Sequence, residues 1–540
     1  MKSPAGTGNS RLAADQSEVI AFLSRPETYG VSEQPRRIDT HAAIVFLAGD
    51  HAYKMKRAVR YPFLDFSTLE KRRAVCEAEI VLNRANAPEL YMDTVPVVRR
   101  GGGLAVGGKG KVVEWLVRMR RFDPDDTLDH VAERGELSDE LIAALVVAIS
   151  RLHRNAPVGD GDAATRRLGE WMRGNTDELA ESPDAVPPEE VEDLRRASQA
   201  EFDRLRDLLL ARGREGFVHR CHGDLHLRNI VLIDGRPVLF DALEFDDALS
   251  THDVLYDLAF LLMDLWQRGM HAEANRVVNR YLWLNHPVEN IDGCALLPLL
   301  MSIRAAIRAK VAVSMARFED RRKARGEIAD ARHYFAFARS FLARGKPVLV
   351  AVGGLSGSGK TTVSAALAPG IGQAPGAVHL RSDIERKRLF GVAVTDRLPA
   401  SAYNREANDE VYARLRDKAG RALRAGASVV VDAVHADPAE RAAIEAVAAE
   451  NHAPFIGIWL DAPESVLLER VAARVGDASD ADAVVVRGQL AGNVGRIGWR
   501  RVDTTAAGHI RRCRSLLAAH ARRSTGALLR GRHTMSGLSR

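Results

Sequence analysis

The sequence predicts two domains with different architectures, an N-terminal α+β domain and a C-terminal α/β domain with a parallel sheet. Its 540 residues exceed what one hydrophobic core organises, so from the length we expect two to four domains. Strand-like segments precede a long helical region up to about residue 344, whereas strands and helices alternate after Pro347, as they do around parallel sheets. The run Gly345-Lys346-Pro347 interrupts the helical pattern, so we place the boundary between the domains there.

The composition indicates a soluble globular protein. Hydrophobic residues make up 46% of the chain and charged residues 27%. No apolar run reaches the roughly 18 residues that span a bilayer, and the N-terminus lacks the apolar stretch of a secretion signal, so we expect a cytoplasmic location. The formal net charge of +6 arises from basic residues spread over the chain, and only the last twenty residues or so are locally unbalanced. We expect disorder in that basic tail because it has few apolar residues.

These patterns divide the chain into a lead with a short helix, the two domains and the tail. The bounds that we expect are 1–34, 35–344, 347–520 and 521–540. The cysteines give no sign of a disulfide framework, since they lie far apart and form no C-x-x-C pair; they are Cys76, Cys221, Cys294 and Cys513. Histidines gather around Cys221, but their spacing fits no common zinc pattern, so we expect reduced, structural thiols.

The N-terminal domain begins with segments of strand character and continues with helices. Alternating apolar residues predict that 43–47 and 52–56 pair as strands around a turn at 48–51. A glycine-rich run separates two later strands, and a hairpin is the plain interpretation, with a phosphate-covering loop as the alternative. The other predicted elements are helices at 17–24, 66–85, 141–152, 198–210 and 325–342 and strands at 94–98 and 111–117.

The C-terminal domain alternates between short apolar strands and longer helices. A strand at 348–352 and a helix at 360–367 flank a glycine-rich loop. Such alternation implies a parallel sheet that helices cover on both faces. The further elements that we expect are strands at 378–381, 428–432, 455–460 and 499–503 and helices at 405–425, 439–450 and 464–474.

The glycine-rich loop of the C-terminal domain has the complete phosphate-binding pattern G-x-x-x-x-G-K-T. Its residues are Gly354, Leu355, Ser356, Gly357, Ser358, Gly359, Lys360 and Thr361, and Thr362 follows in the helix. Glycines let backbone N–H groups turn toward phosphate oxygens, and the N-terminus of the following helix favours the same anion. We therefore expect Lys360 to reach the β- and γ-phosphates of ATP and Thr361 to hold Mg²⁺.

Charged residues after the loop refine the predicted chemistry. Asp432 ends an apolar strand and is suited to orient Mg²⁺ or its water. Asp383 follows another strand and is suited to accept a proton from a substrate hydroxyl, with capping of the next helix as the alternative role. Arg470 and Arg474 are spaced by one helical turn, and we expect them on a lid helix that brings them to the transferring phosphate, with surface solvation as the alternative.

The N-terminal domain holds a second set of phosphate-handling residues. Asp224 and Asn229 lie in the run His222-Gly-Asp-Leu-His-Leu-Arg-Asn, and Asp241 follows a short apolar hairpin. In phosphoryl transfer, a loop aspartate accepts the proton of the acceptor hydroxyl, while an asparagine five residues later and a further aspartate bind Mg²⁺. We therefore expect Asp224 to be the base and Asn229 and Asp241 to be metal ligands. His222 is expected to brace the loop through backbone hydrogen bonds.

Such a site also needs a strand lysine that holds the α- and β-phosphates and a helix glutamate that pairs with it. Lys54 and Lys56 share one face of their strand because side chains alternate along a strand, and Lys56 is our working choice. The helix that follows offers Glu77 and Glu79, and the sequence does not choose between them.

The residues of the N-terminal site resemble the aminoglycoside phosphotransferase family, protein-kinase-like enzymes that phosphorylate antibiotics, choline and sugars. The resemblance covers roughly 35–320 and rests on the run 222–229, on Phe240-Asp241, and on Asp253 and Asp257, which open an apolar helix. It implies a bilobal protein-kinase-like α+β fold. Asp241-Ala-Leu stands where protein kinases have Asp-Phe-Gly. For Asp253 and Asp257 we expect helix capping.

The C-terminal domain resembles the P-loop small-molecule kinases grouped around gluconate kinase, zeta toxin and polynucleotide kinase. The resemblance covers about 347–503 and rests on the loop, Ser382-Asp383, Asp432 and the two lid arginines. It implies an α/β P-loop NTPase fold with Asp383 as the base on the substrate side. It leaves the acceptor open, because acceptors in that group range from sugars to nucleic-acid ends.

The sequence thus predicts a bifunctional phosphotransferase that uses ATP and Mg²⁺ and acts on a hydroxyl of a small molecule, such as a sugar or an aminoglycoside-like metabolite. Two alternatives stay open: a P-loop half that phosphorylates the 5′ end of a nucleic acid, and a half that only senses nucleotide. No recognisable nucleic-acid module supports the first, and the intact sets of acids and lysines argue against the second. We expect neither a nucleic-acid nor a membrane partner.

Overall fold

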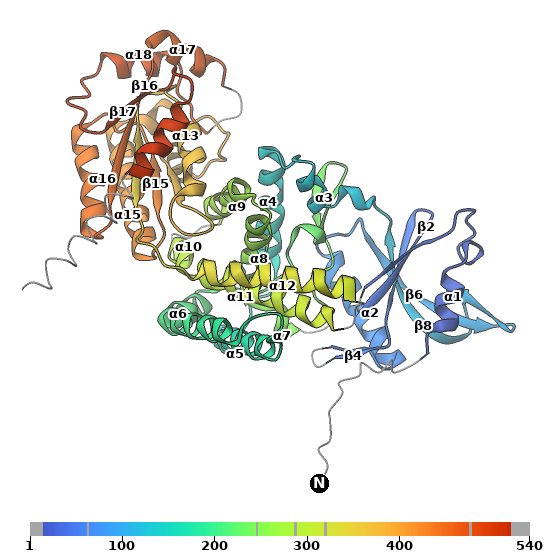
Figure 1. The fold of residues 1–540 in the computed structure, drawn as a ribbon. Helices are drawn as coiled ribbons and strands as arrows, with labels where there is room; N and C mark the ends of the chain where they lie inside the picture. The colour runs from blue at the N-terminus through green and yellow to red at the C-terminus, as the bar shows by residue number, and fades with distance from the viewer. Residues whose placement is uncertain are drawn as a thin grey trace, which may run out of the picture. The chain divides into compact units, whose positions relative to one another are not determined.

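The computed structural model describes residues 15–40, 42–61, 64–244, 247–285, 289–317, 321–474 and 478–519 (Figure 1). The predicted lead before residue 15 and the basic tail lie outside the described residues. Contacts group the chain into two compact units. The first unit contains residues 1–166 and 210–261, and the second contains residues 167–209 and 262–540.

The first unit contains a six-stranded antiparallel sheet with the order β1-β2-β3-β8-β6-β7. The predicted pair of strands around Gly49 and Asp50 is present, with Lys54 opposite Val45. The glycine-rich run holds an additional short strand that pairs with β6, so its glycines form two turns rather than one hairpin. The strands are β1 (Arg36–Asp39), β2 (Ala43–Ala48), β3 (His51–Lys56), β6 (Tyr91–Arg100), β7 (Gly103–Val106) and β8 (Lys111–Arg120), and β4 (Arg60–Tyr61) pairs with β5 (Leu64–Asp65).

Alternation along the strands gives this sheet two apolar faces. Ile44 and Phe46 of β2 pack with α1 (Ser17–Leu23), whereas Leu47 and Ala52 pack with Cys76 and Ile80 of α2 (Leu69–Arg84). Each face is covered because successive side chains of a strand point to opposite sides. This packing fixes the orientation of α2 against β3, so that Glu79 of α2 lies beside Lys54 and Lys56 of β3.

The remainder of the first unit supports the loop that carries Asp224. A hairpin follows that loop, and its turn at Asp234 and Gly235 has φ of 51° and 73°, the left-handed values that tight hairpin turns require. β9 and β12 pair beside it. The elements are α3 (Leu128–Glu133), α4 (Asp139–Asn155), β9 (Val218–Arg220), β10 (Ile230–Ile233), β11 (Arg236–Leu239), α7 (Asp247–Ser250), β12 (Thr251–Asp253) and α8 (Val254–Gln267).

Helices dominate the first part of the second unit, as the sequence predicts. Helices α11 and α12 pack against each other over much of their length, and Ser302 Oγ donates to the carbonyl oxygen of Ala338 at 2.7 Å. The helices are α5 (Gly161–Ala180), α6 (Pro188–Arg214), α9 (His271–Leu284), α10 (Glu289–Asp292), α11 (Leu297–Ala316) and α12 (Arg321–Phe341). The first two of these, like α8, begin or end in the first unit.

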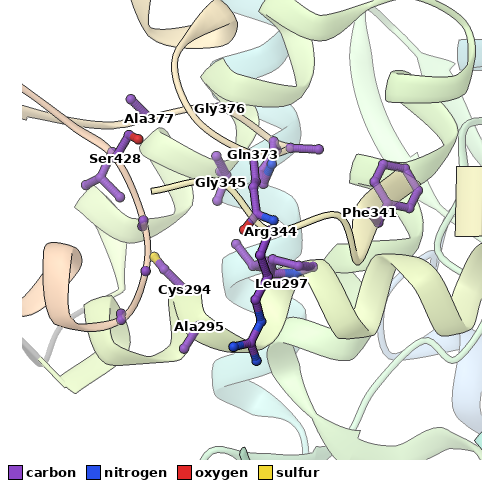
Figure 2. Close-up of a pocket in the computed structure, with 18 of the residues that line it drawn as sticks. Cys294, Ala295, Leu297, Phe341, Arg344, Gly345, Gln373, Gly376, Ala377 and Ser428 are labelled. Atoms are coloured by element: carbon purple, nitrogen blue, oxygen red, sulfur yellow. The ribbon is translucent and has the colours of Figure 1, made fainter. Parts of the chain in front are cut away.

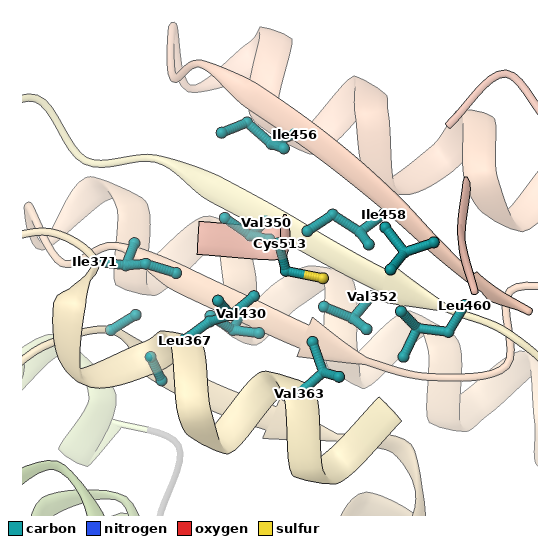
Figure 3. Packing of buried hydrophobic residues seen from close by; sticks show 13 residues of the cluster. Val350, Val352, Val363, Leu367, Ile371, Val430, Ile456, Ile458, Leu460 and Cys513 are labelled. Carbon is teal, nitrogen blue, oxygen red and sulfur yellow. The ribbon is translucent and has the colours of Figure 1, made fainter. Parts of the chain in front are cut away.

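The C-terminal part of the second unit is a five-stranded parallel sheet with the order β14-β15-β13-β16-β17, which confirms the predicted α/β architecture. Its strands are continuous apolar runs because helices cover both faces. Figure 3 shows Val363 and Leu367 of α13 beside Val352 and Val430 of the sheet, with Cys513 in the same buried cluster. The strands are β13 (Leu349–Gly353), β14 (Val378–Arg381), β15 (Val429–Asp432), β16 (Phe455–Asp461) and β17 (Arg500–Asp503).

The helices of this part lie where the sequence predicts them, with two additions, α14 directly after β14 and α18 after α17. They are α13 (Lys360–Leu367), α14 (Ser382–Leu389), α15 (Arg405–Arg424), α16 (Pro438–Glu450), α17 (Glu464–Ala472) and α18 (Ala483–Ala491). Within the described part of the chain, no helix combines the length and the apolar character that crossing a membrane requires. All four cysteines lie in the described part of the chain, where they are buried and form no disulfide.

Candidate functional site

Asp224 lies on the loop between β9 and β10, and Asn229 ends a 3₁₀ turn on the same loop. The amide nitrogen of Asn229 donates to the backbone oxygen of Asp224 at 3.0 Å and to its carboxylate Oδ2 at 2.9 Å. His226 Nε2 lies 3.4 Å from the same carboxylate oxygen. The loop therefore brings the predicted base and one predicted metal ligand together and fixes the direction of the carboxylate.

Asp257 braces this loop from the buried side. Its carboxylate accepts the backbone N–H groups of His222 at 3.1 Å and Gly223 at 2.9 Å, and His153 Nε2 lies 3.2 Å away. Burial opposes ionisation of Asp257, but the hydrogen bond from His153 and the neighbouring histidines outweigh it and hold its pKa below the ordinary value. Helix capping does not describe this residue, because its oxygens hold the loop.

Asp253 and His222 also connect neighbouring segments. Asp253 forms a bidentate ion pair with Arg212 at 2.7 and 2.9 Å, and it accepts the N–H of Leu255 at 2.8 Å, which is a cap-like contact. His222 Nε2 lies 2.9 Å from the backbone oxygen of Phe240, so it braces the segment before Asp241 as the sequence predicts. The sequence offered no local signal for His153, since it comes from the distant helix α4.

The lysines of β3 meet Glu79 of α2. Lys54 Nζ lies 2.8 Å from Glu79 Oε1 and 2.5 Å from Asp241 Oδ1, whereas Lys56 Nζ lies 2.6 Å from Glu79 Oε2 and also contacts Glu244. Both lysines therefore make the predicted pair with the helix glutamate, and the structure favours Lys54 over the working choice of Lys56, because Lys54 also contacts the predicted metal ligand Asp241. Lys56 serves a deeper ion pair.

Glu77 is not the partner of either lysine. Its side chain is half exposed and pairs with Arg73 at 2.8 Å. Two residues along an α-helix correspond to a rotation of about 200°, so Glu77 and Glu79 cannot share a face. Since Glu79 faces the sheet, Glu77 faces solvent, and the expectation that Glu77 binds the cofactor is corrected.

Opposite charges keep Lys54 and Glu79 ionised inside this buried cluster. Burial lowers the pKa of Lys54, but Asp241 and Glu79 raise it well above the ordinary value. Burial raises the pKa of Glu79, but the two lysines bring it down to about 2. Burial also raises the pKa of Glu244, which Lys56 only partly offsets. The cluster thus keeps Lys54 positively charged beside Asp241.

Asp241 has an unusual backbone conformation. Its φ is 62°, in the left-handed region that residues other than glycine rarely adopt. Its N–H donates to the hydroxyl of Tyr91 at 3.0 Å, and the next N–H, of Ala242, donates to Asn83 Oδ1 at 2.8 Å. Strained residues persist where the surroundings hold them, and they cluster at functional sites. Here the strain turns the carboxylate of Asp241 toward Lys54.

These residues line one cleft of about 700 Å³ in the first unit. Its polar lining includes Lys54, Lys56, Asp224 and Asp241, beside Asp129, His130, Arg228 and Glu244. Its apolar part comes from the sheet and from neighbouring segments, through Ile38, Val45, Leu47, Ala52, Met119, Phe122 and Phe240. A polar end beside an apolar wall suits a ligand with a charged group and a flat apolar ring.

The P-loop of the second unit runs from the end of β13 to the start of α13. Three of its glycines have positive φ: Gly354 at 144°, Gly357 at 86° and Gly359 at 87°. A Cβ at Gly354 would lie 2.6 Å from the backbone oxygen of Leu460, and one at Gly357 would lie 2.5 Å from that of Leu467. Both conformation and space therefore demand glycine, and the cradle is built for close approach of a ligand to the backbone.

Thr361 and Asp432 meet at the start of α13, as the sequence predicts for a metal site. Thr361 Oγ1 donates to Asp432 Oδ2 at 2.7 Å. Lys360 Nζ donates to the backbone oxygen of Leu355 at 3.1 Å, and burial lowers its pKa, against the opposing effects of Asp432 and Asp383. Burial raises the pKa of Asp432, but a contact from His379 and other nearby cations bring it to about 2. Asp432 is therefore ionised at neutral pH.

A cleft of about 640 Å³ adjoins the P-loop and collects the remaining predicted residues. Asp383, Thr362, Arg470 and Arg474 line it together with Lys360. Asp383 stands in the first turn of α14, whose cap position is the residue before Ser382, so the alternative of Asp383 as the capping residue is not supported. The cleft thus has a carboxylate opposite a lysine and two arginines.

The two arginines have different settings. Arg470 donates to the backbone oxygen of Gly357 at 3.4 Å and to the side chain and backbone of Thr504 at 2.9 and 3.1 Å, so it links the loop to the segment after β17. The spacing predicts Arg474 one turn after Arg470 on the same helix. Helix α17 ends at Ala472, however, so Arg474 lies beyond the helix. Both still line the same cleft.

Four residues of this cleft were not predicted. Gln489 of α18 accepts the N–H of Ser356 through Oε1 at 2.8 Å, so a side chain occupies a donor of the P-loop. Tyr403, Tyr412 and Glu440 also line the cleft. Their positions depend on tertiary structure, and no local motif marks them.

Two other features hold none of the predicted phosphate-handling residues. His153, Cys221 and Asp257 offer ligand atoms within 4.8 Å of one another, but the Asp257 oxygens already bind the loop that carries Asp224. Figure 2 shows a separate cavity of about 210 Å³, with Leu297 and Phe341 on one side and Gly376 and Ala377 on the other. We therefore assign the chemistry to the two clefts described above.

In comparison with known proteins, two family models match separate stretches of the chain. The model of the phosphotransferase enzyme family matches residues 70–289, and that of an AAA domain family matches residues 348–493. Uncharacterized protein Rv2004c of Mycobacterium tuberculosis is 31% identical to the chain over 482 residues, which cover 86% of this chain and 91% of the relative.

Two solved structures are similar to one part each. A gluconokinase from Sinorhizobium meliloti is 22% identical, covers 35% of this chain and 99% of its own, and gives a TM-score of 0.25. An aminoglycoside 2'-phosphotransferase, solved as its GDP complex, is 12% identical, covers 61% of this chain and 100% of its own, and gives a TM-score of 0.36. The chain belongs to the same family as Rv2004c, and it joins a kinase-like domain of the aminoglycoside phosphotransferase type to a P-loop kinase domain.

Proposed function

We propose that the protein is a phosphotransferase with two active sites, each of which moves the γ-phosphoryl group of ATP to a hydroxyl of a small molecule with the help of Mg²⁺. One observation carries the proposal. Each site brings together a lysine, a metal-binding type of acid and a second carboxylate. In the first cleft these are Lys54, Asp241 and Asp224. In the second, Lys360 and Asp383 line the cleft, and Asp432 lies behind it in contact with Thr361.

In the first cleft the roles follow from geometry. Glu79 holds Lys54, whose ammonium is free to turn from Asp241 toward the phosphates of a nucleotide, and the apolar wall accommodates the purine ring. Asn229 and Asp241 supply amide and carboxylate oxygens, the donors that Mg²⁺ prefers. Asp224, oriented by Asn229, takes the proton of the acceptor hydroxyl. The oxygen of that hydroxyl forms the new bond to the γ-phosphorus, and the bond between the γ-phosphorus and the β-phosphate oxygen breaks.

In the second cleft the P-loop glycines present N–H groups to the phosphates, and Lys360 neutralises their charge. Thr361 and Asp432 are the residues that fit Mg²⁺, since a hydroxyl and an ionised carboxylate already meet there at 2.7 Å. Bound Mg²⁺ would withdraw charge from the phosphate oxygens. Asp383 would accept the acceptor proton, and the arginines would stabilise the transferring group.

A mass-spectrometric screen tests the proposal. The protein is incubated with ATP, Mg²⁺ and a bacterial metabolite extract, and species that gain one phosphoryl group are sought. Asp224→Asn and Lys360→Ala are run beside the wild type, with Asp234→Asn as a matched control, because Asp234 sits in an exposed turn whose positive φ suits asparagine. We expect each site variant to lose its own product and the control to keep both.

Other outcomes have defined meanings. A product that survives the double variant Asp224→Asn with Lys360→Ala would refute the assignment of both sites. Phosphorylated oligonucleotide ends, formed only when Lys360 is intact, would replace the small-molecule acceptor of the second site by nucleic acid. Bound ATP with no product under any condition would favour a nucleotide sensor. We further expect that the protein acts in the cytoplasm and needs no membrane partner.

A further inference from the structure

The edge of the P-loop sheet is covered by a helix from the phosphotransferase segment. β14 is the outermost strand on its side of the sheet, so one row of its backbone groups has no strand to pair with. Helix α9, which lies within the stretch matched by the phosphotransferase family, runs along this edge. Both elements belong to the second compact unit.

Side chains of α9 replace the missing strand. Asn279 accepts the N–H of His379 through Oδ1 at 2.7 Å and donates to the backbone oxygen of Ala377 at 3.1 Å. Trp283 Nε1 donates to the backbone oxygen of His379 at 3.1 Å. The N–H and the carbonyl oxygen of His379 are therefore both held by side chains of α9. Asn279 and His379 are buried. Asn275 extends the contact away from the active site, to the backbone oxygens of Pro375 and Ala377 at 3.0 Å each.

The residue held in this way reaches the metal-binding acid of the P-loop site. His379 Nε2 lies 3.5 Å from Asp432 Oδ2, the same oxygen that accepts the hydroxyl of Thr361 at 2.7 Å. Arg381, two residues along β14, has its Nε 3.8 Å from that oxygen and its guanidinium 5.8 Å from the ring centre of Trp283. The side chains of His379 and Asp432 are 5% and 4% exposed, so water cannot easily replace these contacts.

We propose that Asn279 and Trp283 are positioning residues for the magnesium site of the P-loop domain, and that the phosphotransferase segment thereby contributes a structural wall to the second active site. They act through His379 and Arg381, which set the direction of the Asp432 carboxylate. Buried interiors are close-packed and transmit small displacements, so a shift of β14 moves these side chains. The proposal rests on the proposed use of Mg²⁺ and ATP at this site.

Residues that orient metal ligands change metal affinity when they are replaced. The mildest informative change is Trp283→Phe, which removes one N–H donor and keeps a ring beside Arg381. Asn279→Ala removes both sides of the amide contact. The matched controls are Trp266→Phe, a tryptophan of α8 that stacks on His271, and Asn451→Ala, an asparagine after α16 whose amide donates to the backbone oxygen of Val447.

The experiment measures binding of a fluorescent, non-hydrolysable ATP analogue during a Mg²⁺ titration and again in EDTA. All variants carry Asp241→Asn, so that the magnesium dependence reports the P-loop site alone. We expect Trp283→Phe and Asn279→Ala to raise the Mg²⁺ concentration at half-saturation by about tenfold, the lower end of the effect of residues that orient metal ligands. Nucleotide affinity in EDTA should change less than about twofold, and both controls should behave like the parent.

Calorimetric melting of the same variants separates positioning from general support. An unchanged Mg²⁺ requirement in both variants would overturn the inference. So would a parallel loss of affinity in EDTA, affinity in Mg²⁺ and melting temperature, because that pattern describes a purely structural contact. If the parent itself binds the analogue without any Mg²⁺ dependence, the proposed function of this site fails, and the inference falls with it.

Discussion

Replacement of Glu79 by glutamine tests the buried charge cluster that holds Lys54. Glu79 is completely buried, and its two oxygens lie 2.8 Å from Lys54 Nζ and 2.6 Å from Lys56 Nζ. Glu79→Gln keeps the size of the side chain and removes its charge. Two buried ammonium groups then share only Asp241 and Glu244, so the variant should lose stability and hold Lys54 less firmly.

The size of the effect follows from the pKa of Glu79, which falls from 4.5 to about 2 in the folded protein. A difference of about 2.5 corresponds to roughly 3 kcal/mol, and breaking a buried ion pair costs about 3–5 kcal/mol. For a unit of this size, 3 kcal/mol lowers the melting temperature by about 6–12 °C. Because the folded pKa is depressed, the stabilisation is complete above pH 4.5 and is lost as the pH falls toward 2.

The assay is scanning calorimetry of the wild type and Glu79→Gln between pH 4 and 8, with Glu77→Gln as the matched control. Glu77 lies on the same helix and forms an exposed pair with Arg73, which is worth less than about 0.5 kcal/mol. We expect the melting temperature of Glu79→Gln to lie well below that of the wild type at pH 7, and this difference should become smaller below pH 4.5. The melting temperature of Glu77→Gln should hardly differ from that of the wild type. Equal losses in the two variants would refute the reasoning.

Three further outcomes are expected. Gly357→Ala should abolish nucleotide binding at the P-loop, since φ is 86° and a backbone oxygen lies 2.5 Å from the new Cβ; Gly426→Ala, with φ of 82° and open space, should cost only about 1–2 kcal/mol of stability and leave equilibrium binding intact. Asp257→Asn weakens two charge-assisted hydrogen bonds to the loop that carries Asp224. It should therefore lower ATP turnover at the first cleft, measured with Lys360→Ala in the background, about tenfold or more. Asp139→Asn, at the surface of helix α4, should leave that turnover unchanged. Gln489→Ala should tighten nucleotide binding a few-fold in equilibrium titration, because it frees an N–H of the loop; weaker binding would show that the side chain supports the ligand.

The contiguous motifs could be read from the sequence. In the P-loop, residues 354–361 are neighbours in the chain, and their roles follow from local geometry that glycine alone permits. The spacing of Asp224, Asn229 and Asp241 likewise predicts their proximity, because a short hairpin between the last two leaves little freedom. Strand and helix periodicity was strong enough to place the five parallel strands of the second unit and the helices between most of them.

The roles of other residues could not be predicted from the sequence, because they depend on which face of a helix or strand is buried or on contacts between residues far apart in the chain. Lys54 and Lys56 share a strand face, so only the position of Asp241 separates them. Glu77 and Glu79 are equivalent as letters, and the packing of α2 on the sheet decides which is buried. The loop brace on Asp257 depends on a histidine about a hundred residues away, which no local pattern marks.

The sequence by itself therefore determined the two domain architectures, the two phosphate-handling motifs and the type of reaction, because each depends on residues close together in the chain or on a regular period. Tertiary structure decided which acids contact Lys54 and which carboxylate, that of Asp257, holds the loop of Asp224. It also decided that Gln489 bonds to the P-loop and that α9 packs beside His379. These depend on which faces of separate elements come to lie together, and burial of apolar surface over the whole fold selects that arrangement.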